Sequence, residues 1–149
     1  MEVRERINEG IAFYEPKTEG EVRAYSPITL AYIGDGVYEV LVREHLLHEK
    51  SLPTHILSRK AKRYVSAMAQ SEIYEHLAPE FTETEADYFR RGRNSKAATV
   101  PKNTDVIVYK KATGFETVFG YLYMTGQYAR IRELFEKTVA YVESQSPKK

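Results

Sequence analysis

Hydrophobic residues recur along the chain at the three- or four-residue spacing of amphipathic helices, with polar breaks between the runs. This pattern predicts five main helices, over residues 27–48, 54–77, 83–91, 105–126 and 127–142. A weaker pattern indicates a short helix over 3–14, whereas 16–24 and 92–102 are predicted to be irregular. The β-prone run 106–109 leads into a helical pattern, so we assign it to a helix. The expected fold class is all-α.

Residues that favour helix ends stand at the predicted boundaries. Ser26 before Pro27 is a strong start, because serine caps the first turn and proline fits within it. The other boundaries are predicted by Thr54, by Thr82 with Glu85 as a capping box, by Thr104 and by Gly126.

Composition narrows the class of protein. The chain has 149 residues, 42% of them hydrophobic, which fits one globular domain. It has no cysteine, which excludes disulfides, thiol catalysis and cysteine-based zinc sites. No stretch is apolar enough to cross a membrane, and the N-terminus does not resemble a signal peptide. We therefore expect a cytoplasmic protein without a membrane partner.

The net charge is only +1, from 22 basic and 21 acidic residues, so the overall balance does not point to a nucleic acid. The distribution is more informative. Four basic residues lie within 59–63, and five more lie within 90–102, where no acid occurs. Each cluster fits either a solvated helix face or a surface for phosphates.

Two acids stand on otherwise apolar helices. Asp35 lies between two glycines in the helix 27–47, and Glu116 lies between Gly114 and Gly120 in the fourth helix. If the helices cross at their glycines, the two carboxylates meet and can bind Mg²⁺, which prefers oxygen ligands and retains several waters. The alternative is that each acid pairs with an arginine in a purely structural role.

Three segments carry a resemblance to a known family. The segment TLAYIGDGVYEVLVREHLL resembles the first ribonuclease III motif, with Gly-Asp and a glutamate four residues later. The segment RRGRNSKAATVPKNTDVIVYKKATGFETVFGYLYM, and LSRKAKRYVSAMAQSEI before it, resemble the small branch of that family called Mini-ribonuclease III. The resemblance covers roughly residues 25–140 and keeps the order of the motifs.

The resemblance implies a helical bundle like the ribonuclease III endonuclease domain, acting as a homodimer that cuts double-stranded RNA with Mg²⁺. It implies a role in maturing the ends of the large-subunit (23S) ribosomal RNA precursor, with a ribosomal protein as a candidate partner. We place the catalytic domain at 25–143, after an N-terminal extension at 1–24 and before a polar tail at 144–149, with no separate RNA-binding domain.

When the family motifs are matched to this sequence residue by residue, the resemblance implies that Asp35 and Glu116 are the catalytic, metal-binding carboxylates. Three positions that are acidic in larger ribonuclease III enzymes are not acidic in this chain, where they are Ile28, Ala31 and Thr113. We therefore expect Mg²⁺ to be held largely through water and substrate phosphate. Glu39 also matches the family, and we expect it to support the site by pairing with Arg43 one turn later.

Given this resemblance, the second basic cluster, within residues 90–102, is a candidate RNA-binding surface. Double-stranded RNA is recognised mainly through phosphates and 2′-hydroxyls. The expected RNA-binding residues are Arg91, Arg93, Asn94, Ser95, Lys96 and Lys102. The cluster at 59–63 is the alternative RNA surface.

Two other functions stay open. Because the acids expected at Ala31 and Thr113 are missing, the domain could bind structured RNA or assist ribosome assembly without cutting. It could also be a different helical, metal-dependent phosphohydrolase acting on nucleotides, although the His-Asp pairs of that class are not evident. Retention of both Asp35 and Glu116 favours the nuclease.

Overall fold

A computed structural model describes residues 11–48, 50–95, 100, 102 and 105–145. The described residues form helices and no strand, which confirms the all-α prediction. In chain order the helices are α2 (Glu19–Arg23), α3 (Pro27–Leu47), α4 (Thr54–Val65), α5 (Ala67–Leu77), the 3₁₀ helix η1 (Ala78–Glu80), α6 (Glu83–Arg93), α7 (Val106–Met124) and α8 (Tyr128–Ser144). None of the described helices is long and apolar enough to cross a membrane.

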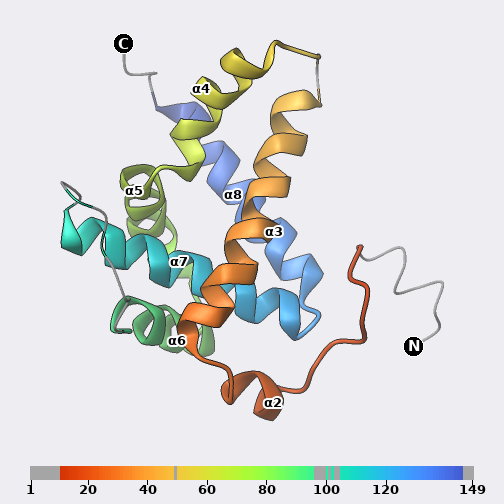
Figure 1. The fold of residues 1–149 in the computed structure, drawn as a ribbon, viewed down its shortest axis with the longest axis vertical. Helices are drawn as coiled ribbons and strands as arrows, with labels where there is room; N and C mark the ends of the chain where they lie inside the picture. The colour runs from red at the N-terminus through yellow and green to blue at the C-terminus, as the bar shows by residue number, and fades with distance from the viewer. Residues whose placement is uncertain (1–10, 49, 96–99, 101, 103–104, 146–149) are drawn as a thin grey trace.

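Helix α7 is the centre of the fold. It runs across the middle of the bundle, with α3 crossing it and α5, α6 and α8 packed around it (Figure 1). Every residue from Ala112 to Leu122 except Glu116 is buried. Two of these residues, Phe115 and Phe119, pack against Tyr38 of α3. Because a helix that is apolar on all sides is stable only when surrounded, the sequence of α7 accounts for its central place.

Several predicted helix ends are confirmed. The Ser26 side chain accepts a hydrogen bond from the Ile28 N–H and caps α3. Thr82 and Glu85 form the predicted capping box of α6. Gly126, with φ of 76°, ends α7, because the backbone there enters the left-handed region that favours glycine.

Other predicted boundaries were wrong. The helix expected over 54–77 is two helices, because Ser66 has extended backbone angles; it ends α4 and its side chain caps α5. Thr54 is the first residue of α4 and not its cap. Asp105, rather than Thr104, caps α7 by accepting hydrogen bonds from two backbone N–H groups. Thr104 lies outside the described residues.

The segment before α3 also differs from the prediction. Residues 11–14 are not helical, and 1–10 lie outside the described residues. Residues 16–24, expected to be irregular, contain α2, which begins with a capping box formed by Thr18 and Glu21. Val22 of α2 belongs to the hydrophobic core. The extension predicted for 1–24 therefore contributes to the packing of the domain in its described part.

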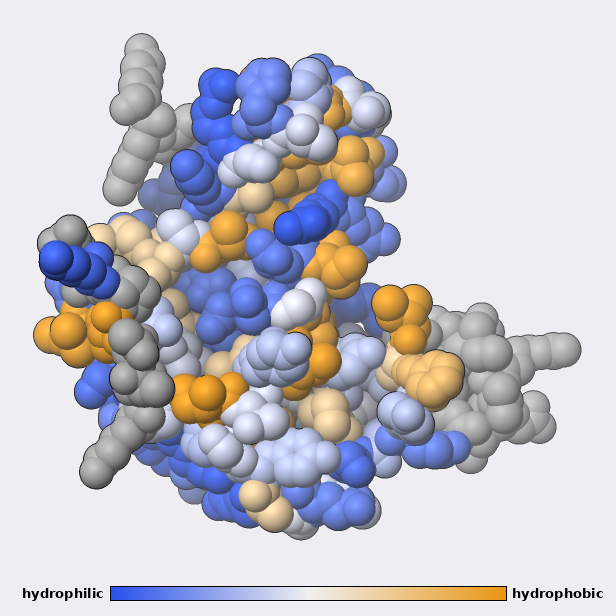
Figure 2. Space-filling model, in the orientation of Figure 1, coloured by the Kyte–Doolittle hydropathy of each residue, from blue (hydrophilic) through white to orange (hydrophobic). Residues whose placement is uncertain are grey.

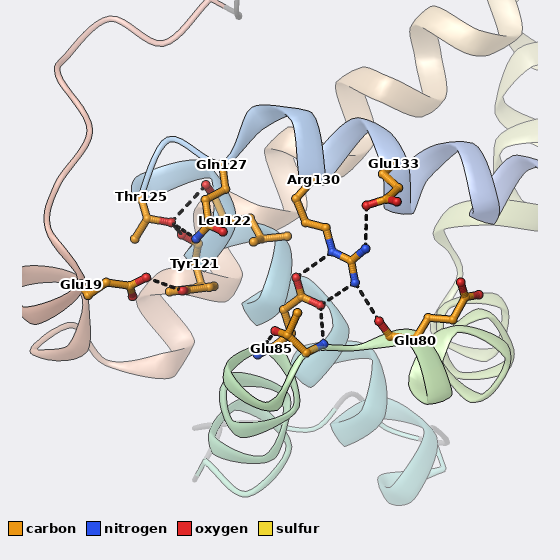
Figure 3. A network of polar contacts seen from close by, with 10 residues as sticks. Glu19, Glu80, Glu85, Tyr121, Leu122, Thr125, Gln127, Arg130 and Glu133 are labelled. Atoms are coloured by element: carbon orange, nitrogen blue, oxygen red, sulfur yellow. Dashed lines mark hydrogen bonds and ion pairs between the residues drawn. The ribbon is translucent and has the colours of Figure 1, made fainter. Parts of the chain in front are cut away.

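A buried ion pair joins α8 to the start of α6 (Figure 3). The Arg130 guanidinium donates to both Glu85 carboxylate oxygens at 2.8 and 2.9 Å, and also to Glu133 and the Glu80 carbonyl. Glu85 is buried, and such a charge needs a paired, hydrogen-bonded partner. The same view shows the Tyr121 hydroxyl donating to Glu19 at 2.7 Å, which ties α2 to α7.

Candidate active site

Helices α3 and α7 cross at two glycines. A Cβ atom on Gly34 would overlap the Glu116 carbonyl oxygen, and one on Gly120 would overlap the Leu30 carbonyl oxygen. The two backbones can approach this closely only because neither residue has a side chain. The other glycines do not serve this crossing: Gly36 has open space around its Cα, and Gly114 lies against Phe89 of α6.

The crossing brings together the two acids singled out in the sequence. Asp35 is exposed on α3, and Glu116 is half-buried on α7. Burial raises the pKa of Glu116 to about 8, helped by the charge of Asp35 and by a hydrogen bond between the two carboxyl groups. A hydrogen bond from Gln70 of α5 lowers this pKa, and the more distant charge of Glu39 raises it. A carboxyl with a strongly raised pKa beside a second acid is typical of a functional site.

Two further positions that the resemblance leads us to expect as acids, Ala31 and Thr113, have no carboxylate. Ala31 is buried, and the Thr113 hydroxyl donates to the Tyr109 carbonyl one turn back in α7. Glu39 is held by Arg43 at 3.6 Å, which confirms the predicted pair. Among the described residues no group of three histidines, cysteines or acids could hold a metal ion.

Two carboxylates nevertheless suit one kind of metal. Asp35 and Glu116 repel each other when both are ionised, and a hard divalent cation between them would relieve that repulsion. Mg²⁺ is commonly held by one or two carboxylates, several waters and substrate phosphates rather than by a complete protein cage. The donor set is therefore compatible with such a cation in the presence of a phosphate substrate.

Arg91, a predicted RNA-binding residue, is bonded to the protein itself. Its Nη2 donates to the Arg23 and Tyr25 carbonyls at 3.3 and 3.5 Å, and its guanidinium lies 4.9 Å from the centre of the Tyr88 ring. Its buried Nη1 has no hydrogen-bond partner within the described part of the chain. In this arrangement Arg91 links α6 to the junction of α2 and α3.

The other predicted RNA-binding residues lie at or beyond the C-terminal end of α6. Arg93 Nε donates to the side-chain Oδ1 of Asn94 at 3.1 Å, and the Ser95 hydroxyl donates to the backbone carbonyl of Gly92 at 2.7 Å. Lys102 is exposed, and Lys96 lies outside the described residues. No described contact joins these side chains to Asp35 or Glu116. The end of α6 that carries Arg93 lies against α7, since Gly92 packs against Thr117 and Gly114.

The alternative basic cluster lies on α4. Arg63 donates to the Val142 and Gln145 carbonyls at 2.8 and 2.9 Å, so its charge is used at the C-terminal end of α8. Arg59, Lys60 and Lys62 are exposed. Part of this cluster is therefore structural, and the rest is accessible to an anion.

One polar residue at the site was missed by the sequence analysis. Gln70 is almost fully buried, at 1% exposure, and it hydrogen-bonds to Glu116. The segment YVSAMAQSEI contains a glutamine among small and apolar residues, which is a weak signal of a buried polar group. The pattern does not reveal which side of the helix faces the acids.

Comparison with known proteins identifies the family. Residues 28–127 match the ribonuclease III domain. The Mini-ribonuclease 3 of Symbiobacterium thermophilum is 46% identical over 117 residues, covering 78% of this chain and 90% of that protein. That of Thermoanaerobacter sp. is 39% identical, covering 85% and 89%. A crystal structure of a Fusobacterium nucleatum protein matches with a TM-score of 0.70 and 29% identity, covering 80% of this chain and 96% of that one. The chain therefore belongs to the ribonuclease III family, among the Mini-ribonuclease 3 endoribonucleases.

Proposed function

We propose that this endoribonuclease cleaves double-stranded RNA in a Mg²⁺-dependent reaction, with Asp35 and Glu116 as its catalytic, metal-binding carboxylates. The observation that carries the proposal is the meeting of these two acids at the glycine crossing of α3 and α7. Asp35 is exposed and can contact a substrate phosphate, whereas Glu116 is half-buried and less accessible to water. The family membership supports the same reaction.

Each carboxylate has a distinct task in this proposal. When bound, Mg²⁺ supplies Lewis-acid stabilisation of the phosphodiester and a water of lowered pKa. Asp35 is exposed, so it would hold the outer side of the metal site, where the phosphate backbone of the duplex binds. Glu116 holds the inner side, and its burial strengthens its interaction with any charge placed next to it.

The RNA is held, in this proposal, by the polar end of α6 and the segment that follows. Arg93, Lys96 and Lys102 contact phosphates, and Asn94 and Ser95 contact 2′-hydroxyls, as double-stranded RNA requires. Arg91 supports this surface through its bonds to the Arg23 and Tyr25 carbonyls. The exposed part of the α4 cluster is the second candidate for phosphate contacts.

We extend the proposal to the cellular setting that the resemblance implies. The substrate is the large-subunit (23S) ribosomal RNA precursor, processed in the cytoplasm by a homodimer, with a ribosomal protein as candidate partner. One acidic pair cuts one strand, so a duplex break needs the second pair that a two-fold dimer supplies.

The test replaces each carboxylate by its amide. Asp35→Asn and Glu116→Gln should each lower cleavage of a long RNA duplex at least about 100-fold, because each removes an anionic ligand. Chelation of Mg²⁺ should abolish cleavage by the wild type. Circular dichroism and duplex binding in Ca²⁺ should remain as in the wild type. Wild-type cleavage by either variant would remove that residue from the proposed site.

A non-cleaving RNA-binding module is the second candidate. It is favoured by one observation: Ala31 and Thr113 leave only two of the family's carboxylates at the crossing. The same assay separates the two functions. Tight duplex binding with no cleavage by the wild type in Mg²⁺ or Mn²⁺ would establish the binding module and exclude the nuclease.

A further inference from the structure

Gln70 is a polar side chain enclosed in the core of the bundle. Its exposure is 1%, and it is among the largest fully buried side chains of the protein. Buried polar groups are retained where they have a partner, since an unsatisfied amide destabilises the fold. The partner of Gln70 is the side chain of Glu116 on α7.

The backbone of α5 explains how Gln70 reaches that position. The extended backbone of Ser66 ends α4 and gives α5 a separate direction, and the Ser66 hydroxyl accepts a hydrogen bond from the Ala69 N–H. Gln70 follows in the first turns of α5, which packs against α7. Glu116 is thus approached by Asp35 from α3 and by Gln70 from α5.

We propose that Gln70 is a positioning residue that holds the Glu116 carboxylate in the orientation in which it shares a divalent cation with Asp35. This inference rests on the proposed function and deepens it. An amide NH₂ group can donate to one carboxylate oxygen while the other oxygen stays available to a cation. Because the amide can donate but carries no charge, it can orient the carboxylate without competing with the cation.

A purely structural role for Gln70 makes a different prediction. If the amide only fills a polar space in the core, its removal changes the stability of the metal-free protein and leaves the affinity for metal unchanged. If Gln70 is a positioning residue, its removal weakens the affinity for metal, because a carboxylate freed from its hydrogen bond must be reoriented each time a cation binds.

The experiment compares three variants of the full-length protein. Gln70→Met keeps the length of the side chain but removes the donor, and Gln70→Asn keeps the amide on a chain too short to reach Glu116. Ser71→Ala is the matched control, because Ser71 is a buried polar neighbour on the same helix. Binding of Mn²⁺ is measured by electron paramagnetic resonance, the Mg²⁺ dependence of duplex cleavage is measured in parallel, and thermal unfolding is followed in chelator.

Gln70→Met and Gln70→Asn should each weaken Mn²⁺ binding about tenfold, with a matching rise in the Mg²⁺ concentration needed for cleavage. Ser71→Ala should bind Mn²⁺ as the wild type does. Wild-type affinity in a folded Gln70 variant would overturn the inference, and so would loss of the fold in both variants, which would make Gln70 a core residue only. If the wild type neither binds Mn²⁺ nor cleaves the duplex, the proposed function itself fails.

Discussion

The Glu116 carboxyl is surrounded by groups that favour its protonated form. Burial and the charge of Asp35 raise its pKa to about 8, and the hydrogen bond from Gln70 only partly opposes them. A divalent cation next to Glu116 would act in the opposite direction, because a positive charge favours the ionised carboxylate. At the scale of single residues, the site is therefore unfavourable for two bare carboxylates and suited to a cation.

This balance predicts how the metal-free protein responds to pH. Between about pH 4.5 and about pH 8, the folded protein keeps the Glu116 proton and the unfolded chain does not. The free energy of unfolding should therefore gain a negative slope from this group as pH rises through that range. Urea unfolding in chelator should show this slope in the wild type and a weaker one in Glu116→Gln. Equal slopes in the two proteins would contradict the prediction.

Arg91 and Arg93 are predicted to differ, although they are two residues apart. Arg91→Ala loses two hydrogen bonds to carbonyls and the contact with Tyr88, so it should lower the free energy of unfolding by about 2 kcal/mol. Arg93→Ala loses only a hydrogen bond to the adjacent Asn94 side chain and a contact at 5.8 Å with the centre of the Phe89 ring, so it should lower the free energy of unfolding by less than about 1 kcal/mol. It should reduce the salt slope of duplex binding by about one. Urea unfolding and salt titrations in Ca²⁺ measure both quantities. Normal stability with weakened binding in Arg91→Ala would show that Arg91 contacts RNA directly.

The crossing of α3 and α7 depends on close contact between two backbones. Gly34 and Gly120 face each other's helices, and each has a backbone atom of the other helix where a Cβ would be placed. Asp35 follows Gly34 directly, so the distance between the helices also sets the distance between the carboxylates. At the scale of elements, the glycines determine both the packing and the geometry of the site.

Gly120→Ala should therefore be strongly destabilising. Its Cβ would overlap backbone atoms of Leu30, which cannot move without shifting α3, and such overpacking should lower the free energy of unfolding by about 3 kcal/mol. The matched control is Gly36→Ala in α3, which has open space and should raise that free energy by about 0.5–1 kcal/mol. Urea unfolding of both variants checks the pair. Similar effects at the two glycines would show that the crossing is looser than described.

An apolar stripe on α3 remains exposed in the single chain. Tyr32 is 83% exposed and Ile28, one turn before it, is 37% exposed, and helical spacing puts both on the face of α3 that carries the exposed Asp35. Figure 2 shows hydrophobic residues exposed among hydrophilic ones on the face that presents α3. Asp35 lies along this stripe, so a second copy packed there would bring a second acidic pair close. Tyr38, by contrast, is buried in the core and is not part of this surface.

At the scale of the whole molecule, this surface predicts a homodimer. Tyr32→Glu places a charge in the proposed two-fold interface, where it would face its own copy. Light scattering should give a dimer mass for the wild type and a monomer mass for the variant, with unchanged circular dichroism. Duplex cleavage by the variant should yield single-strand nicks in place of double-strand breaks. A monomeric wild type that still makes duplex breaks would exclude this role of the dimer.

Local patterns were enough to predict the fold class and most helices. The helical spacing of apolar residues, Ser26 before α3 and the Thr82–Glu85 capping box act within a few residues, so they can be recognised without tertiary contacts. The meeting of Asp35 and Glu116 was also predicted, because glycines near both acids indicated close helix packing. Recognition of the family motifs identified the same two acids.

Only the tertiary structure decided the features that depend on contacts between distant segments. The break at Ser66 sets the direction of α5, so helical phase counted from α4 could not place Gln70 beside Glu116. Arg91 looks like a free cation in a basic run, but it is bonded to carbonyls 66 and 68 residues earlier in the chain. Sequence periodicity determines which residues of a helix share a face, whereas the partner of that face is determined by packing.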